Sequence, residues 1–189
     1  IPVIVVTSKA LREDERNPLY HKAYDGVYPP GSTFKIVVAA AALESGVMKP
    51  EDKVSCSGRA WYYNRFYHCH KPEGHGCVNL RSGMAQSCDC YFYEAARRTG
   101  IEKIAEMAKK FGLGHNYMLG ITGGKAGSVP NDEWKRANVK EKWYDGDTIS
   151  AGIGQGYVTS TPFQLAVMCS RIAGGHSGHP HRVLYDWHS

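Results

Sequence analysis

Apolar residues with helical spacing predict the first clear element of this sequence. After a polar segment at residues 7–30, the stretch "KIVVAAAALES" predicts a helix that begins near Ser32 and ends before Gly46. Its interior is rich in alanine and uncharged after the first lysine, so we expect burial on nearly all sides. The opening "IPVIVV", residues 1–6, predicts a buried strand.

Further helices are predicted downstream, near residues 80–86, 90–99 and 101–111 and from residue 161 onward. The third is the clearest, because its apolar residues recur every three or four positions and a glycine follows. The last begins with a capping box, in which Thr161 caps the helix, Pro162 takes its first position and Gln164 its third.

The remaining stretches lack periodicity. Residues 51–79 predict irregular structure, residues 112–150 predict loop, and the pattern is lost after Gly174. A chain of 189 residues that is 42% hydrophobic can build one core, so we expect a single domain over residues 1–189.

Charge and hydropathy exclude two classes of partner. The formal net charge is +5, but the lysines and arginines form no stripe, so we expect no binding to nucleic acid. No run approaches the roughly 20 apolar residues of a membrane span, and no segment has the form of a signal peptide. We therefore expect any membrane anchor to lie outside this chain.

A serine and a lysine share one face of the first predicted helix. Ser32 and Lys35 lie one turn apart in "YPPGSTFK", and Lys35 is the only charge between Asp25 and Glu44. Burial of a lysine amine disfavours its charged form and lets it take a proton from a serine nucleophile, and the helix N-terminus favours a developing oxyanion. Alternatively, Ser32 is an ordinary N-cap and Lys35 a solvated residue.

The motifs resemble those of class B penicillin-binding proteins, in particular the penicillin-binding protein 2 subfamily. "GVYPPGSTFK" is similar to the first active-site motif, "SCD" at residues 87–89 to the second, and "WYDGDTISAGIGQGYVTSTPFQLA" to a later segment. The resemblance covers residues 17–173 and implies the α+β fold of penicillin-binding proteins and serine β-lactamases. Here we expect mainly its helical part, with an incomplete sheet of one or two strands.

The resemblance implies a role for each matching residue. Ser32 would be the acylated nucleophile and Lys35 its general base. Ser87 would relay a proton to the leaving group, and Asp89 would hold the lysine and the substrate peptide. The matching substrate-binding residues are Gly154, Gln155 and Gly156.

The implied activity is peptidoglycan D,D-transpeptidation. The donor would be a stem peptide ending in D-Ala-D-Ala, and β-lactams would acylate the same serine. By the same resemblance, the partners would be a membrane glycosyltransferase and a cell-shape scaffold protein, and the location the periplasmic face of the bacterial inner membrane.

One motif of the family is missing. No K-T-G or K-S-G follows "GIGQG", and residues 174–189 depart from the family pattern. We therefore expect a truncated domain with weak activity, because loss of an oxyanion donor alone can cost about 10²–10³ in rate. Two alternatives stay open: a zinc-stabilised interaction module without turnover, and a serine β-lactamase or β-lactam sensor.

Five of the six cysteines fall between residues 56 and 90, together with several histidines. Such clustering indicates a metal site or a disulfide, although free buried thiols remain an alternative. The resemblance favours a structural Zn²⁺ bound by four residues, Cys56, Cys69, His75 and Cys88. Other nearby candidates are Cys77, Cys90, His68 and His70, whereas helical spacing places Cys169 in the core.

Aromatic residues crowd the same stretch, at Trp61, Tyr62, Tyr63, Phe66 and Tyr67. We expect most of them to pack the segment against the body of the protein. The alternative is a patch that binds a partner or a glycan.

Overall fold

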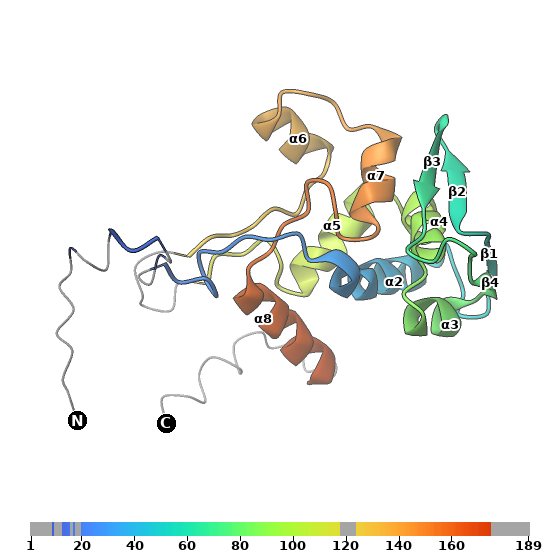
Figure 1. The fold of residues 1–189 in the computed structure, drawn as a ribbon, viewed down its shortest axis with the longest axis horizontal. Helices are drawn as coiled ribbons and strands as arrows, with labels where there is room; N and C mark the ends of the chain where they lie inside the picture. The colour runs from blue at the N-terminus through green and yellow to red at the C-terminus, as the bar shows by residue number, and fades with distance from the viewer. Residues whose placement is uncertain (1–8, 10–12, 16, 18–19, 118–123, 175–189) are drawn as a thin grey trace.

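A computed structural model describes residues 9, 13–15, 17, 20–117 and 124–174 (Figure 1). Its helices are η1 (Gly31–Phe34, a 3₁₀ turn), α2 (Lys35–Glu44), α3 (Leu80–Ala85), α4 (Asp89–Thr99), α5 (Ile101–Lys110), α6 (Asp132–Asn138), α7 (Asp145–Ala151) and α8 (Pro162–Ala173). Its strands are β1 (Val54–Cys56), β2 (Arg59–Tyr62), β3 (Arg65–His68) and β4 (Gly76–Val78). Mixed helix and sheet with helices predominating agrees with the predicted α+β class.

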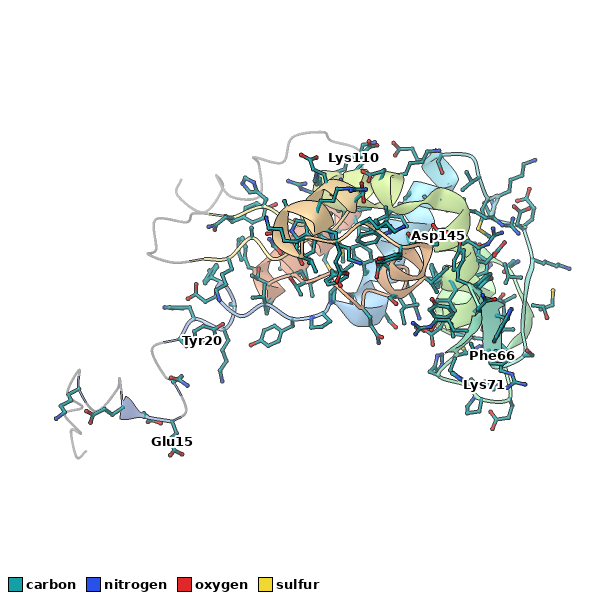
Figure 2. The ribbon with its side chains drawn as sticks, turned by 90° about the horizontal axis from the view of Figure 1, so that it is seen from above. Glu15, Tyr20, Phe66, Lys71, Lys110 and Asp145 are labelled. Atoms are coloured by element: carbon teal, nitrogen blue, oxygen red, sulfur yellow. The ribbon has the colours of Figure 1, made fainter. Side chains whose placement is uncertain are left out.

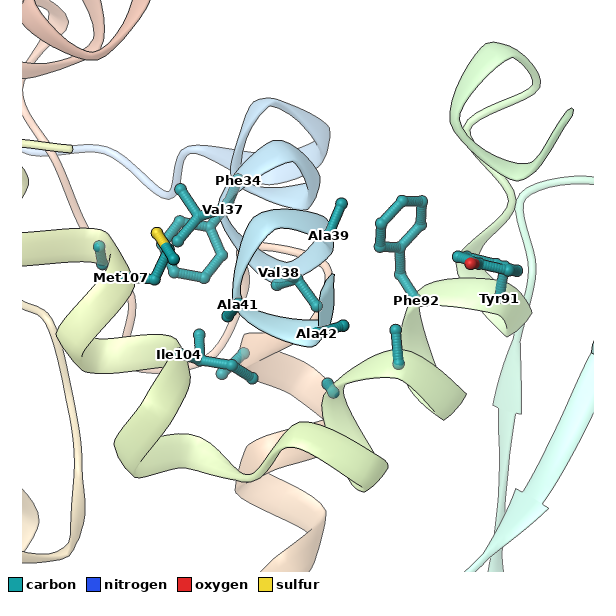
Figure 3. Packing of buried hydrophobic residues seen from close by; sticks show 14 of the residues in the cluster. Phe34, Val37, Val38, Ala39, Ala41, Ala42, Tyr91, Phe92, Ile104 and Met107 are labelled. Atoms are coloured by element: carbon teal, nitrogen blue, oxygen red, sulfur yellow. The ribbon is translucent and has the colours of Figure 1, made fainter. Parts of the chain in front are cut away.

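Helix α2 lies at the centre of the described core. It packs against α4 and α5, with Val38 and Ala42 turned into the cluster that contains Phe92 and Ile104 (Figure 3). Its small side chains allow the neighbouring helices to approach closely, as dense interiors require. The predicted burial of this helix is confirmed, and Gly46 follows it with a positive φ of 69°.

The other predicted helices are confirmed as α3, α4, α5 and α8. The capping box at the start of α8 has the expected form: Thr161 Oγ1 accepts from Gln164 N, and Gln164 Oε1 accepts from Thr161 N. The prediction for Cys169 is wrong, because its side chain is exposed. Within the described residues, α8 buries only Gln164 and Met168, so one narrow stripe of this helix meets the core.

Residues 51–79 are more ordered than predicted. They contain two separate antiparallel pairs, β1 with β4 and β2 with β3. These strands are three or four residues long, too short for alternation to be recognised. Tyr63 and Asn64 form the tight turn of the β2–β3 hairpin with φ of 49° and 60°, although neither residue is glycine.

The predicted loop at residues 112–150 contains two helices, α6 and α7. Each has seven residues, so fewer than two full turns are present to show an apolar period. The Asn131 side chain caps α6 by accepting from Trp134 N at 2.8 Å. The strand predicted at residues 1–6 and the segment from residue 175 lie outside the described residues.

The length and composition of the described helices determine whether any of them could cross a membrane. Among the residues that the structure describes, no helix combines the length and the apolar character that a bilayer crossing demands.

Candidate active site and metal site

Ser32 lies in η1, the 3₁₀ turn that leads into α2, and its side chain is exposed. The preceding Gly31 has a φ of +56° and donates its N–H to the Gly154 carbonyl at 3.0 Å. A side chain at Gly154 would meet the Gly31 carbonyl oxygen at 2.2 Å, so only glycine allows these two turns to touch. The turn therefore presents the Ser32 hydroxyl to solvent at a fixed place.

Lys35 is almost completely buried, with 1% of its surface exposed. Its Nζ donates to Asp89 Oδ1 at 2.6 Å, to the Ser87 carbonyl at 2.8 Å and to Ser87 Oγ at 2.9 Å. It also lies 5.6 Å from the centre of the Phe92 ring. The alternative of a solvated Lys35 is therefore wrong, and so is the N-cap alternative for Ser32, because Pro30 precedes the turn as its cap residue.

Ser87 connects the buried lysine to the exposed serine. Its hydroxyl donates to Ser32 Oγ at 3.0 Å and accepts from Lys35. Its backbone has a φ of 51°, in the left-handed region that serine rarely occupies. The hydrogen bonds of Ser87 N to Met84 O and of Cys88 N to Gly83 O hold this conformation at the junction of α3 and α4. Strained backbone of this kind clusters at functional sites.

Asp89 is the first residue of α4 and joins two parts of the site. Its Oδ1 accepts from Lys35, while Oδ2 accepts from His70 N at 2.9 Å and lies 3.3 Å from His70 Nδ1. Burial acts to raise the pKa of Asp89, but the hydrogen bonds from Lys35 and His70 outweigh it and hold the pKa below its ordinary value. The carboxylate is therefore ionised and paired at neutral pH.

His70 is a site residue whose role the sequence did not reveal. It was a candidate metal ligand, whereas its backbone N–H and its ring both contact Asp89. Its position beside Cys69 was the only sequence feature that linked it to the site.

The structure brings the predicted residues Gly154, Gln155 and Gly156 to the edge of the site through the Gly31–Gly154 hydrogen bond. Gly154 and Gly156 have φ of +69° and +71°, which a side chain would strain. Gln155 is exposed, and its N–H donates to the Ser150 carbonyl. The segment thus lies beside the turn of the nucleophile with its glutamine open to solvent.

The four predicted metal ligands converge. Cys56, Cys69, His75 and Cys88 place their ligand atoms within 4.8 Å of one another. His75 Nδ1 lies 3.6 Å from Cys56 Sγ and 3.5 Å from Cys69 Sγ. A tetrahedral zinc ion, with Zn–S near 2.3 Å and Zn–N near 2.1 Å, sets such ligand atoms about 3.6 Å apart. The donor set and its spacing therefore fit zinc.

The remaining candidates lie outside this group of four. Cys77 is exposed, while Cys90 is buried next to Cys88. A hydrogen bond from the Cys90 thiol lowers the pKa of Cys88 to about 5, against the opposing effect of burial. Because thiolates are the form that binds metal, this environment favours Cys88 as a ligand. All six cysteine thiols are free in the structure.

Comparison with known families identifies the class of protein. The family model described as the penicillin binding protein transpeptidase domain matches residues 3–186, so the chain belongs to this family. Within the family, its similarity is to class B transpeptidases of the penicillin-binding protein 2 type.

Two curated relatives illustrate that similarity. The peptidoglycan D,D-transpeptidase MrdA of Escherichia coli strain K12 is 39% identical over 161 residues, which cover 83% of this chain and 25% of the relative. The MrdA protein of Acinetobacter baumannii is 38% identical over 179 residues, covering 91% and 26%. The chain thus spans about a quarter of the length of these relatives.

Two solved structures share the fold. Pseudomonas aeruginosa PBP2 in complex with WCK 5153 has a TM-score of 0.82 and 39% identity, over 86% of this chain and 37% of that one. PBP2 of Helicobacter pylori, in a complex with MreC, has a TM-score of 0.77 and 30% identity, over 83% and 30%.

Proposed function

We propose that this chain carries the acyl-transfer centre of a peptidoglycan D,D-transpeptidase. The observation that carries the proposal is the hydrogen-bond chain from the exposed Ser32 hydroxyl through Ser87 to the buried Lys35–Asp89 pair. A nucleophile, a base within reach of it and a third group that orients the base are the parts that covalent catalysis requires.

In the first half-reaction, Ser32 Oγ attacks the carbonyl carbon of the peptide bond between the two terminal D-alanines. Its proton passes through the Ser87 hydroxyl to Lys35, which must be a neutral amine at that moment. The carbon–nitrogen bond then breaks, and the proton returns from Lys35 through the Ser87 hydroxyl to the leaving D-alanine amine. General acid–base catalysis of this kind contributes about 10²–10⁴ in rate.

The acyl ester left on Ser32 is the substrate of the second half-reaction. An amine of a neighbouring stem peptide attacks the ester carbon, a new amide bond forms and the ester carbon–oxygen bond breaks. The proton released by the amine passes through Lys35 and Ser87 to Ser32 Oγ, which regenerates the hydroxyl. The N-terminal end of α2 lies beside Ser32, and its positive potential favours the oxyanion that develops in both steps.

β-Lactams would enter the same pathway at its first step. Attack of Ser32 on the strained ring opens it and leaves a covalent acyl-enzyme. A serine β-lactamase would share this step but would hydrolyse the ester rapidly. The rate of deacylation therefore separates the two enzymes.

The descriptions of similar structures support a proposal about partners and location. Helicobacter pylori PBP2 is described in a complex with MreC, and another similar structure, 34% identical, as a peptidoglycan synthase complex that coordinates polymerisation and crosslinking. We propose that the intact protein works beside a membrane glycosyltransferase and a scaffold protein. We propose the periplasmic face of the inner membrane as the location of the site.

We also propose that Cys56, Cys69, His75 and Cys88 hold one structural zinc ion. Three thiolates and one imidazole fill all four tetrahedral positions and leave none for water or substrate. When bound, the ion would supply a cross-link between the segment at residues 56–75 and the start of α4. No step of the acyl transfer runs through it.

The primary test is intact-protein mass spectrometry of the chain after incubation with a labelled penicillin. We expect one stable covalent adduct on the wild-type chain and none on Ser32→Ala. Circular dichroism of both proteins checks that they are folded. A folded wild-type chain without an adduct would overturn the proposed activity for this chain and favour the interaction module.

Native mass spectrometry of the same sample tests the metal. We expect one zinc per chain, lost in Cys56→Ser and kept in Cys77→Ser, which removes an exposed thiol outside the group of four. A metal-free chain whose mass has fallen by the hydrogens of a disulfide would refute the zinc proposal.

A further inference from the structure

The β2–β3 hairpin has two faces of opposite character. In its register Arg59 pairs with His68 and Trp61 with Phe66, so these four side chains share one face. All four are exposed, with 56% of Trp61 and 45% of Phe66 open to solvent. We call these four residues the outer hairpin face.

The opposite face fixes the hairpin to the body of the protein. Tyr62 donates its hydroxyl to Glu94 at 2.8 Å, and the Tyr67 ring lies 5.5 Å from that of Tyr93. The Tyr93 hydroxyl in turn donates to the His68 carbonyl at 2.9 Å. Because α4 holds the inner face, the outer hairpin face is presented as a pre-organised surface, which lowers the cost of binding.

The aromatic pair on the outer hairpin face is tightly arranged. The Trp61 and Phe66 rings lie 4.5 Å apart at 65°, and the Arg59 guanidinium lies 4.4 Å from the centre of the Phe66 ring. Such a cross-strand pair stabilises the hairpin, but it leaves more than half of the surface of Trp61 in water. Exposed aromatic rings grouped with an arginine are characteristic of binding surfaces.

The hairpin projects from the body beside α4, whose first residue is Asp89 (Figure 1). Its base, His68, is two residues from His70, whose N–H is bonded to Asp89. At about 3.4 Å per strand residue, Phe66 lies about 7 Å along β3 from His68, at the end of the hairpin that leads to His70. Phe66 and the exposed Tyr20 lie on opposite sides of the molecule (Figure 2).

We propose that the outer hairpin face binds the glycan strand of peptidoglycan, a proposal that rests on the proposed function. The apolar face of a sugar ring stacks on Trp61 and Phe66, and the Arg59 guanidinium pairs with a carboxylate of the strand or its stem peptides. The outer hairpin face is complementary in charge to these carboxylates, because the ionisable groups among its four residues are an arginine and a histidine. An anionic membrane surface is less favoured, because polybasic clusters of several lysines or arginines serve that role.

The test measures binding of the purified chain to soluble peptidoglycan strands that keep their stem peptides, by isothermal titration calorimetry. We expect Trp61→Ala and Phe66→Ala each to raise Kd at least about fivefold, and Trp61→Phe to recover most of the affinity. Arg59→Gln should weaken binding to these strands but not to N-acetylglucosamine oligomers, which lack carboxylates. Tyr20→Ala is the matched control, an exposed aromatic removed on the opposite side of the molecule, and should leave Kd unchanged.

Failure of this proposal is distinguishable from failure of the transpeptidase proposal. Hairpin variants should still form the penicillin adduct, and Ser32→Ala should still bind strands. Unchanged Kd in both alanine variants would overturn the glycan site. So would a wild-type chain that binds anionic phospholipid vesicles but no strands, or a chain dimer that dissociates on Trp61→Ala.

Discussion

Two lysines of this protein are equally withdrawn from water but have different neighbours. Lys35 on α2 is 1% exposed and Lys135 on α6 is 2% exposed. Lys35 donates to the Asp89 carboxylate and to the Ser87 hydroxyl, and Ser87 in turn donates to the exposed nucleophile Ser32. Lys135 donates to Asp147 at 2.7 Å and lies over the rings of Tyr144, at 4.7 Å, and Tyr157, at 5.2 Å.

The comparison shows that burial alone does not make a lysine reactive. Around Lys135, burial acts to lower the pKa, but the hydrogen bond and the charge of Asp147 outweigh it and raise the pKa. The faces of the Tyr144 and Tyr157 rings further favour the charged form of Lys135. Lys135 is therefore a fixed charge that joins α6 to α7, whereas Lys35 has a hydroxyl beside it through which a proton can leave.

The largest predicted effect comes from removing the base. Lys35→Met should lower the rate of acylation by labelled penicillin by at least about 10³-fold, measured from adduct formation over time. Lys35→Arg is the matched variant, because it keeps a positive charge beside Asp89 but cannot give up its proton. A slow Lys35→Met variant alongside a fully active Lys35→Arg would show that charge, and not proton transfer, is the contribution of Lys35.

Removal of the relay should have the next largest effect. Ser87→Ala keeps the Lys35–Asp89 pair but deletes the hydroxyl between Lys35 and Ser32, so acylation should slow by about 10²-fold. The same time course of adduct formation measures it. Ser82→Ala, which removes a serine hydroxyl from the capping box of α3, is the control and should keep the wild-type rate. An unchanged rate in Ser87→Ala would show that the proton reaches Lys35 by another route.

Lys135→Met tests whether the second buried lysine has a structural role only. It should lower Tm by more than about 5 °C, because it leaves Asp147 without its buried partner. At temperatures where the variant is folded, its acylation rate should stay within about threefold of wild type. Differential scanning calorimetry and the adduct time course measure the two effects. A variant with normal Tm and lost acylation would show that Lys135 belongs to the chemistry.

The smallest effects lie at opposite ends of the pH scale. The folded pKa of Asp89 is lowered, so its pairing stabilises the protein above its ordinary pKa near 3.8 and is lost as pH falls through the folded value. The folded pKa of Lys135 is raised, so its stabilisation is complete below about 10.5 and is lost as pH rises through the folded value. Urea denaturation across the pH range measures both limbs.

One variant tests each limb of the dependence of stability on pH. Lys135→Met should flatten the alkaline limb and leave the acid limb, while Asp89→Asn should do the reverse. If either variant altered both limbs, the two ion pairs would not be independent features.

The sequence predicted those parts of the fold that repeat a local pattern. The helices α2, α4, α5 and α8 have 10 to 12 residues, so their periodicity was sufficient, whereas α3 was predicted although it has only six residues. The strands and the helices α6 and α7 were missed, because three to seven residues leave too little pattern and tertiary contacts decide the conformation.

In the candidate site, too, local patterns predicted some contacts and missed others. Ser32 and Lys35 are one turn apart, so their proximity followed from helical geometry. The contacts of Lys35 and Ser32 with Ser87 join residues 52 and 55 positions apart, and only the family motif linked them. The contact of His70 with Asp89, and the aromatic surroundings of Lys135, depend on segments that no local pattern connects.

The assembly of the site from α2 and the α3–α4 junction has a consequence for experiments on folding. The nucleophile and its relay become neighbours only when helices distant in sequence have packed, so a partly folded chain holds the serine without its base. Covalent labelling by a penicillin would then report cooperative folding rather than local helix formation. Pulses of labelled penicillin during refolding would time the docking of α2 on α4, with each adduct marking a molecule that had completed that step.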